Sequence, residues 1–352
     1  VTFVTETLTI DVYIEHCKDA CMNPTAPATL ADTPLVPQAD TSAFAALVAR
    51  LSRQSVEKNH DAYADVAWDS PEMAIDPHDS RFQLPDWECV ARTDWYKSQT
   101  PQVQAAFGLA RYATAMKVGG EFENVLQRGL LTHAFWLPNG AVEFRYMHHE
   151  VIEESQHTLM FQEFINRSGT NVKGLRRDEK LGSGFALRCS RTRPALFFMF
   201  VLGGEDPVDY LQRRSLAGHD LHPLLERITR IHLTEEARHL SFARNYLKRT
   251  VPQLSATRRH ALALFAPLLF GSMARMMVYP RPSLLKAFGV PRKQVRQSLR
   301  HPDQRAVLAE SVAKTRRTCT ELGLMTPAAK LLWKACGVWA DVSAKPASRR
   351  QA

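Results

Sequence analysis

Apolar residues recur every three to four positions along most of the chain, and this spacing predicts amphipathic helices. The longest segments with this pattern are Pro101 to Trp136, Val142 to Ile165, Pro194 to Leu216, Leu221 to Arg249 and Ala256 to Val278. Shorter helices are expected over Ala43 to Leu51, from Pro282, and from Asp303 to Trp339. No segment alternates convincingly between apolar and polar residues in the main body. We therefore predict an all-α fold with one main helical domain.

The two ends of the chain and one internal stretch lack this pattern. Residues 1–40 contain a short strand-like segment, Thr7 to Ile14, followed by four prolines, and we expect a poorly ordered proline-rich arm. The helical domain is predicted over residues 41–343, with a disordered tail at 344–352. Asn166 to Gly184 is rich in Gly, Asn, Lys and Arg, so we expect a loop there.

Two apolar runs, Ala195 to Gly204 and Ala261 to Ala274, are shorter than the roughly 18 to 20 residues that a membrane span requires. Arginines bound them at Arg193 and Arg275. We interpret both runs as core helices whose neighbours cover every face, and we predict no membrane span.

Composition and charge indicate which kinds of partner the protein lacks. The chain has 352 residues and a formal net charge of +9, but its basic residues are scattered among helical patterns, and no pattern of a known nucleic-acid reader accompanies them. We therefore expect no nucleic-acid partner. The six cysteines are widely spread and suggest reduced thiols in a cytoplasmic protein rather than a disulfide framework.

Candidate chemistry begins with two short motifs on separate helical segments. Glu154 and His157 are three residues apart, and His232, Glu236 and His239 follow one another at spacings of four and three. At about 100° per residue, each set lies on one face of its helix. Carboxylate and imidazole pairs on two helices are how four-helix bundles hold two metal ions.

Both motifs share their faces with apolar residues. Met147, Val151 and Phe161 lie on the side of Glu154, and Ile228 and Leu240 lie on the side of His232. A carboxylate placed among such residues costs several kcal/mol unless it is paired or bound to a cation. The pattern therefore favours metal ligands over a solvated row of charges.

Two metals also require a carboxylate from each of the other two helices. Glu205 is the first charge after a long apolar run and follows Gly203 and Gly204. The first helix offers Glu121 and Glu123. We favour Glu123, because Met116, Gly119, Leu126 and Leu130 share its side, whereas Lys117, Asn124 and Arg128 share that of Glu121.

Four carboxylates and three imidazoles without a thiolate suit iron or manganese better than zinc or copper, and iron is the first choice. Glu150 and Asp209 each stand one turn from a proposed ligand, where they could orient the imidazoles. Glu153 and Glu235 are each next to a proposed ligand but rotated by about 100° from it, so we predict that they face outward.

These residues resemble the AurF family of p-aminobenzoate N-oxygenases. The likeness spans Leu51 to Trp339 and is carried by the segments Phe122–Leu131, Glu153–His157, Glu205 and His232–His239. It implies a ferritin-like four-helix bundle with flanking helices and two iron ions on seven ligands, with His232 as the additional histidine. The implied ligands are Glu123, Glu154, His157, Glu205, His232, Glu236 and His239.

The resemblance also implies an enzyme that uses O2 to oxidise a small organic substrate, most readily the nitrogen of an arylamine. It implies an external electron donor and a homodimer. Three alternatives remain open at this stage. They are a di-iron hydroxylase or desaturase of an apolar substrate, a ferritin-like iron-binding protein without enzymatic activity, and a basic helical binding protein with an accidental array of acids and histidines.

Overall fold

A computed structural model describes residues 42–218 and 220–339 of the chain. Within these two ranges the regular elements are helices and no strand occurs, which confirms the all-α prediction. The expectations for the arm, its strand-like segment and the tail at 344–352 concern residues outside the described part.

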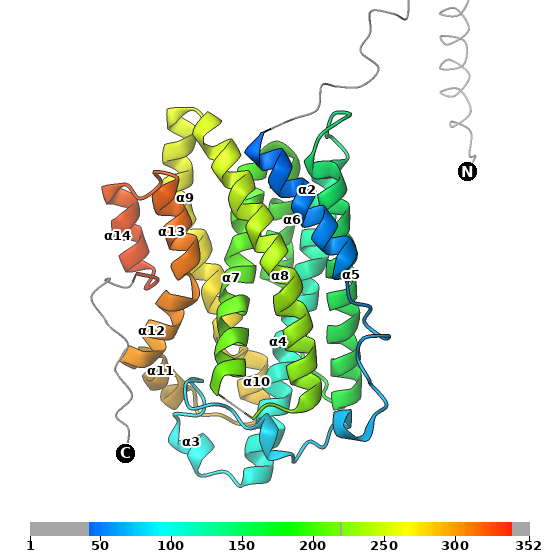
Figure 1. Ribbon diagram of the computed structural model, residues 1–352. Helices are drawn as coiled ribbons and strands as arrows, with labels where there is room; N and C mark the ends of the chain where they lie inside the picture. The colour runs from blue at the N-terminus through cyan, green and yellow to red at the C-terminus, as the bar shows by residue number, and fades with distance from the viewer. Residues whose placement is uncertain (1–41, 219, 340–352) are drawn as a thin grey trace, which may run out of the picture. The chain divides into compact units, whose positions relative to one another are not determined.

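Four long helices form a bundle that carries the proposed metal ligands (Figure 1). They are α4 (Pro101–Ala134), α5 (Glu143–Ser168), α7 (Pro194–Gly218) and α8 (Pro223–Thr250). Their starts follow local chemistry: the hydroxyl of Thr100 accepts a hydrogen bond from the Val103 amide at the head of α4, and Pro101 and Pro223 occupy first-turn positions. Gly169 ends α5 in the left-handed conformation, with φ of 64°.

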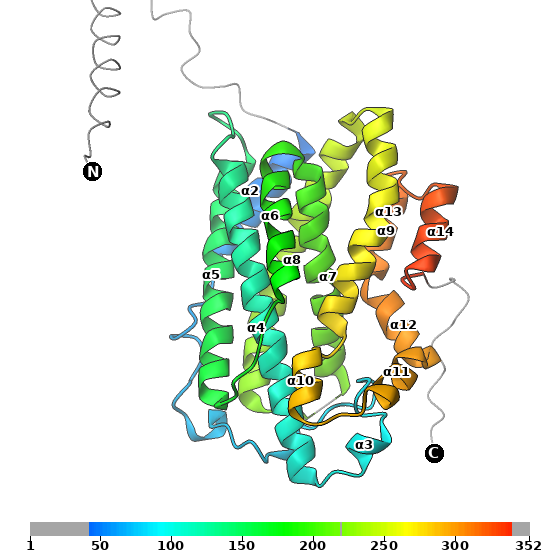
Figure 2. The same cartoon turned by 180° about the vertical axis from the view of Figure 1, so that it is seen from behind.

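Three further helices pack on this bundle, as Figure 2 shows from behind. α2 (Ala43–Glu57) lies against α5 and α8, α6 (Arg177–Thr192) against α4 and α7, and α9 (Ala256–Val278) against α7. The loop predicted over Asn166 to Gly184 is therefore wrong from residue 177 onward. The side chain of Glu179 accepts a hydrogen bond from the backbone amide of Arg176, and this cap starts a helix that composition alone does not reveal.

Shorter elements complete the described part of the chain. Two 3₁₀ turns, Pro71–Met73 and Ser80–Phe82, and the short α3 (Asp94–Lys97) connect α2 to α4. At the C-terminal side lie α10 (Pro282–Ala287), α11 (Arg292–Arg300), α12 (Pro302–Ser311), α13 (Ala313–Glu321) and α14 (Pro327–Ala335). α12, α13 and α14 pack against α7 or α9, whereas α10 packs against α4 and α11 against α12 (Figure 1).

Glycines let the bundle helices approach closely where the aromatic core is densest. A Cβ atom at Gly204 of α7 would lie 2.1 Å from the ring of Phe122 on α4, and one at Gly129 of α4 would lie 2.2 Å from the ring of Phe197. Neither contact is possible for a larger residue without movement. The position of Glu205 therefore depends on the small residue that precedes it.

Helix α9 differs from the sequence prediction in one respect. By length and composition, the segment Ala256–Ala287 could cross a membrane, although a buried core helix meets the same criterion. In the fold its apolar side packs into the core, with Phe270 and Ala274 fully buried. Phe265 and Leu268 are exposed, so the expectation that neighbours cover every face of this run is wrong.

Candidate metal centre

The four bundle helices bring all seven predicted ligands together in the interior. Each of these side chains is at most 2% exposed. Glu123 comes from α4, Glu154 and His157 from α5, Glu205 from α7, and the motif that starts at His232 from α8. The faces predicted from helical spacing are thus the faces that point inward.

The donor atoms form two groups, each tight enough to surround an ion. Glu123, His157 and His232 each offer an atom within 4.8 Å of the others, and so do Glu150, Glu154 and His239. Two overlapping groups join these ends, and both include Glu236. One contains Glu154 and His157, and the other contains Glu205 and His232. Each end could therefore hold an ion, and Glu236 belongs to both of the groups that join the two ends.

Two of the three imidazoles are held by carboxylates from the opposite helix. His157 Nε2 lies 2.9 Å from an oxygen of Glu235, and His239 Nε2 lies 2.7 Å from an oxygen of Glu153. In both rings Nδ1 faces the inner carboxylates: His157 Nδ1 is 3.4 Å from Glu154, and His239 Nδ1 is 2.9 Å from Glu236. This is the usual arrangement for histidines that bind a metal through one nitrogen.

The prediction that Glu153 and Glu235 face outward is therefore wrong. Both are buried, at 2% and 0% exposure. Rotation by 100° from the metal-facing side of α5 or α8 leads to the interface between these two helices, where each carboxylate meets the imidazole of the other. The signal was present in the sequence as a repeated Glu-Glu-x-x-His motif, at Glu153–His157 and again at Glu235–His239.

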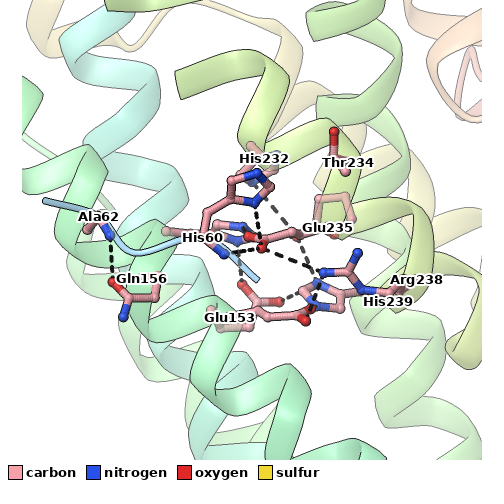
Figure 3. A network of polar contacts seen from close by, with 12 residues as sticks. His60, Ala62, Glu153, Gln156, His232, Thr234, Glu235, Arg238 and His239 are labelled. Carbon is pink, nitrogen blue, oxygen red and sulfur yellow. Dashed lines mark hydrogen bonds and ion pairs between the residues drawn. The ribbon is translucent and has the colours of Figure 1, made fainter. Parts of the chain in front are cut away.

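An outer layer supports these two carboxylates (Figure 3). Arg238 donates to Glu153 over 2.8 Å. Glu235 accepts from both the backbone amide and the ring Nδ1 of His60, each at 3.0 Å. His60 belongs to the segment that follows α2, so the chain outside the bundle helps to fix the imidazole of His157.

The third imidazole, His232, is held differently. Its Nδ1 lies 3.0 Å from the side-chain oxygen of Gln212 on α7, and its Nε2 lies 3.2 Å from Glu123. Glu121 points elsewhere: it accepts from the Leu175 amide at 2.7 Å and pairs with Lys180 at 3.0 Å. This geometry favours Glu123 as the carboxylate from α4, and Gln212 is an orienting group that the sequence did not suggest.

Neither residue predicted to orient the imidazoles does so. Asp209 pairs with Arg213 on the same helix at 2.8 Å and with Lys314 on α13 at 2.6 Å, and the second ion pair ties α7 to the C-terminal helices. Glu150 is fully buried beside Glu154 and His239, but neither of its carboxyl oxygens has a hydrogen-bond partner. The orienting interpretation of Asp209 and Glu150 is wrong.

Burial and neighbouring charges shift the pKa values of several cluster residues, and a bound cation would compensate the buried negative charge. Burial and the neighbouring carboxylates raise the pKa of Glu205 well above its ordinary value, and burial also raises that of Glu123. Burial alone would lower the pKa of His157, but its hydrogen bonds to Glu154 and Glu235 raise it well above the ordinary value. The raised pKa values of Glu205 and His157 favour their protonated forms, and metal ions would displace those protons.

The donor set fits two ions of iron or manganese. Oxygen donors outnumber nitrogen donors, the imidazoles are preoriented, and the four cysteines of the described part, Cys89, Cys189, Cys319 and Cys336, are free thiols outside the cluster. Comparison with known proteins agrees with this interpretation, because the family model "P-aminobenzoate N-oxygenase AurF" matches residues 41–323. The chain belongs to the AurF family. The roles of the seven residues as ligands stay a prediction.

The chain is also similar to proteins whose names do not state an activity. Uncharacterized proteins of Mycobacterium tuberculosis (strain CDC 1551 / Oshkosh) and of Mycobacterium bovis (strain ATCC BAA-935 / AF2122/97) are each 39% identical over 303 residues. The alignments cover 85% of this chain and 89% of each relative. No solved structure matches.

A cavity adjoins one end of this AurF-family cluster. It has a volume of about 1080 Å³, part of which is open to solvent, and Glu123, Glu205 and His232 form part of its wall. The rest of the wall is mainly apolar and aromatic, and includes Tyr112, Met116, Phe122, Phe161, Leu225, Ile228 and Met277. A partly enclosed, mainly apolar cavity with a few polar groups is the usual form of a binding site for a small organic molecule.

Polar groups gather at another part of the cavity wall. Arg111, which is buried, pairs with Glu88 at 3.1 Å and donates to the backbone oxygen of Val278, also at 3.1 Å. Its Nε atom and the indole Nε1 of Trp87 are buried without a hydrogen-bond partner. Both residues line the cavity, so they form a polar part of its wall.

Proposed function

We propose that this protein is a non-haem di-iron oxygenase that uses O2 to oxidise a small organic molecule. The observation that carries this proposal is the cavity, because three proposed ligands, Glu123, Glu205 and His232, form part of its wall. An iron store requires a path for ions, whereas this cavity is largely lined with apolar side chains, as the sites of organic substrates usually are. The match to the AurF family supports the same reaction class.

The chain's own residues would position the substrate and limit water. Apolar side chains such as Phe161 and Ile228 line the space beside the cluster, where they favour an aromatic ring. Arg111 and Trp87 would supply a polar part of the wall for a polar substituent. When bound, the two iron ions would supply the activation of O2, with electrons from an external donor.

N-oxygenation of an arylamine is the reaction that we favour. An arylamine presents a ring for the apolar wall and a nitrogen lone pair that can be oxidised. The matching family is that of p-aminobenzoate N-oxygenase, and an acceptor group opposite the amine would suit the polar part of the wall at Arg111 and Trp87. Hydroxylation or desaturation of an apolar substrate is the alternative reaction.

The test is reconstitution of the purified protein with Fe(II), followed by O2, a chemical reductant and a panel of substituted anilines. We expect hydroxylamine, nitroso or nitro products by mass spectrometry, with oxygen derived from labelled O2. His157→Ala should abolish product, whereas Glu121→Gln, which alters a carboxylate outside the cluster, should retain it.

Other results would replace the proposal. Products oxidised at carbon would favour the hydroxylase alternative. Two bound iron ions with O2 consumption but no organic product from any compound would favour the iron-binding alternative. Absence of stoichiometric metal would reject both.

A further inference from the structure

Glu150 is a buried acid that the seven-residue cluster does not use. It lies on α5, one turn before Glu154, and none of its surface is exposed. Both of its carboxyl oxygens lack a hydrogen-bond partner. A carboxylate in such a place is unfavourable unless it is protonated or binds a cation, so its presence calls for an explanation.

The surroundings of Glu150 supply no protein cation except an imidazole of the cluster. No Lys or Arg in the described ranges forms an ion pair with it. The hydroxyl of Tyr146, one turn earlier on α5, is also buried and has no partner. Glu150 does share a compact group with Glu154 and His239, whose donor atoms lie within 4.8 Å of one another.

Glu150 lies at the end of the cluster that has fewer imidazoles. Two imidazoles, His157 and His232, belong to the group at one end, and a single imidazole, His239, belongs to the group at the other. Glu150 is in the group with the single imidazole. It therefore stands where one end of the cluster has fewer nitrogen donors.

The cavity distinguishes the same two ends. Glu123, Glu205 and His232 line it, whereas Glu150, Glu154 and His239 do not. An ion that must react with O2 and substrate needs open coordination positions, but an ion remote from the substrate does not. An additional protein ligand at the His239 end would therefore close the remote ion without obstructing the reactive one.

We propose that Glu150 is an eighth protein ligand of the metal centre, and that it binds the ion at the His239 end, away from the cavity. This inference rests on the proposed di-iron centre. A carboxylate is a suitable donor there, because hard oxygen ligands hold iron and manganese.

The test is anaerobic titration of the metal-free protein with Fe(II), comparing Glu150→Gln with Tyr146→Phe. The first variant keeps the size of the side chain but removes a strong metal donor. The second removes the other unpartnered polar group on the same side of α5. We expect Glu150→Gln to bind one Fe(II) as the unaltered protein does and the second at least tenfold more weakly, while Tyr146→Phe binds both normally.

Thermal unfolding of the metal-free proteins supplies a second readout. Glu150→Gln should unfold at the same or a higher temperature than the unaltered protein without metal, because it removes an unpaired buried acid, but should gain less stability from Fe(II). A purely structural role predicts the reverse, a lower unfolding temperature without metal.

Three results would overturn the proposal: normal binding of both ions by Glu150→Gln, equal weakening in Tyr146→Phe, or loss of the metal-free fold in Glu150→Gln. If the unaltered protein binds two ions and Glu150→Gln binds them equally well, only the role of Glu150 fails. If the unaltered protein binds none, the proposed di-iron centre fails with it.

Discussion

Glu153 and Glu235 connect two helices through the imidazoles that they hold. The carboxylate on α5 bonds the imidazole on α8, and the carboxylate on α8 bonds the imidazole on α5. Each bond fixes the outer nitrogen of a ring and leaves the other nitrogen facing the cluster. The same two contacts therefore orient the proposed ligands and hold the helix pair together.

Neutralising either of these carboxylates should weaken metal binding. For Glu153→Gln or Glu235→Gln we expect a 10- to 100-fold loss of Fe(II) affinity, because the imidazole loses its charged acceptor and its fixed orientation. Calorimetric or spectroscopic titration measures the effect. Glu226→Gln is a matched control on α8, since Glu226 is half-buried, lies outside the cluster and pairs with the exposed Arg230. Equal affinity in all three variants would contradict the orienting role.

Metal uptake should depend on pH with a definite sign. Burial opposes protonation of His239, but Glu236 and Glu154 raise its pKa well above 6.5, and His157 behaves alike. Their protonation stabilises the metal-free fold, a contribution that is complete below pH 6.5 and is lost as pH rises through the folded pKa. Metal must displace these protons, so apparent affinity should rise with pH. Proton release in weak buffer on adding Mn(II) measures it, and uptake without proton release would contradict it.

The seven proposed ligands could be predicted from the sequence because each is an acid or a histidine on the apolar face of a helix. That property favours Glu123 over Glu121, and the structure buries Glu123 while Glu121 pairs with Lys180. The outer residues share no such property. Gln212 and His60 meet the cluster only through tertiary packing, so periodicity within one helix could not identify them.

At the scale of elements, helix spacing around Glu205 depends on glycine. Gly204→Ala should destabilise the protein by about 1–3 kcal/mol, because its Cβ would overlap the ring of Phe122. Denaturant unfolding measures the change. The matched control is Gly182→Ala in α6, where a Cβ meets nothing within 4 Å and should stabilise the helix by about 0.5–1 kcal/mol. Equal effects of the two substitutions would contradict the close packing of α4 and α7.

The long helices were predicted from the spacing of their apolar residues, but α6 was missed. The spacing of apolar residues identified α4, α5, α7, α8 and α9, and their observed bounds agree with the predicted ones to within a few residues. α6 was taken for a loop because Gly182 and Gly184 and several charged residues dominate its first half. Its exposed face and its packing on α4 and α7 are tertiary properties that composition does not record.

At the scale of the whole molecule, the metal centre should contribute to stability. A buried cluster with four acids and three imidazoles is complete only in the folded chain, so ions bind the folded state preferentially. At a hundredfold excess over the dissociation constant we expect a gain of about 2.7 kcal/mol per ion from Mn(II) or Fe(II). Differential scanning calorimetry measures it, with reversal by a chelator. Mg(II), which avoids imidazole ligands, is the control, and an equal gain from Mg(II) would contradict a selective site.

The homodimer and the cytoplasmic location inferred from the sequence stay predictions. Light scattering on the purified protein measures the mass directly, and a monomer would reject the dimer.

The hydrogen bonds between His60 and Glu235 connect the metal cluster to a backbone amide outside the bundle, whose exchange with solvent can be measured. The backbone amide of His60 donates to the Glu235 carboxylate, which also contacts the imidazole of His157. The rate at which this amide exchanges with solvent deuterium should therefore depend on how rigidly the imidazole is held. We expect this amide to exchange more slowly once Mn(II) fixes the ring, while the amide of Tyr63, bonded to Asp61 nearby, keeps its rate. Metal binding at the buried cluster could then be followed by measuring deuterium exchange of the His60 amide by mass spectrometry, without a chromophore or a turnover assay.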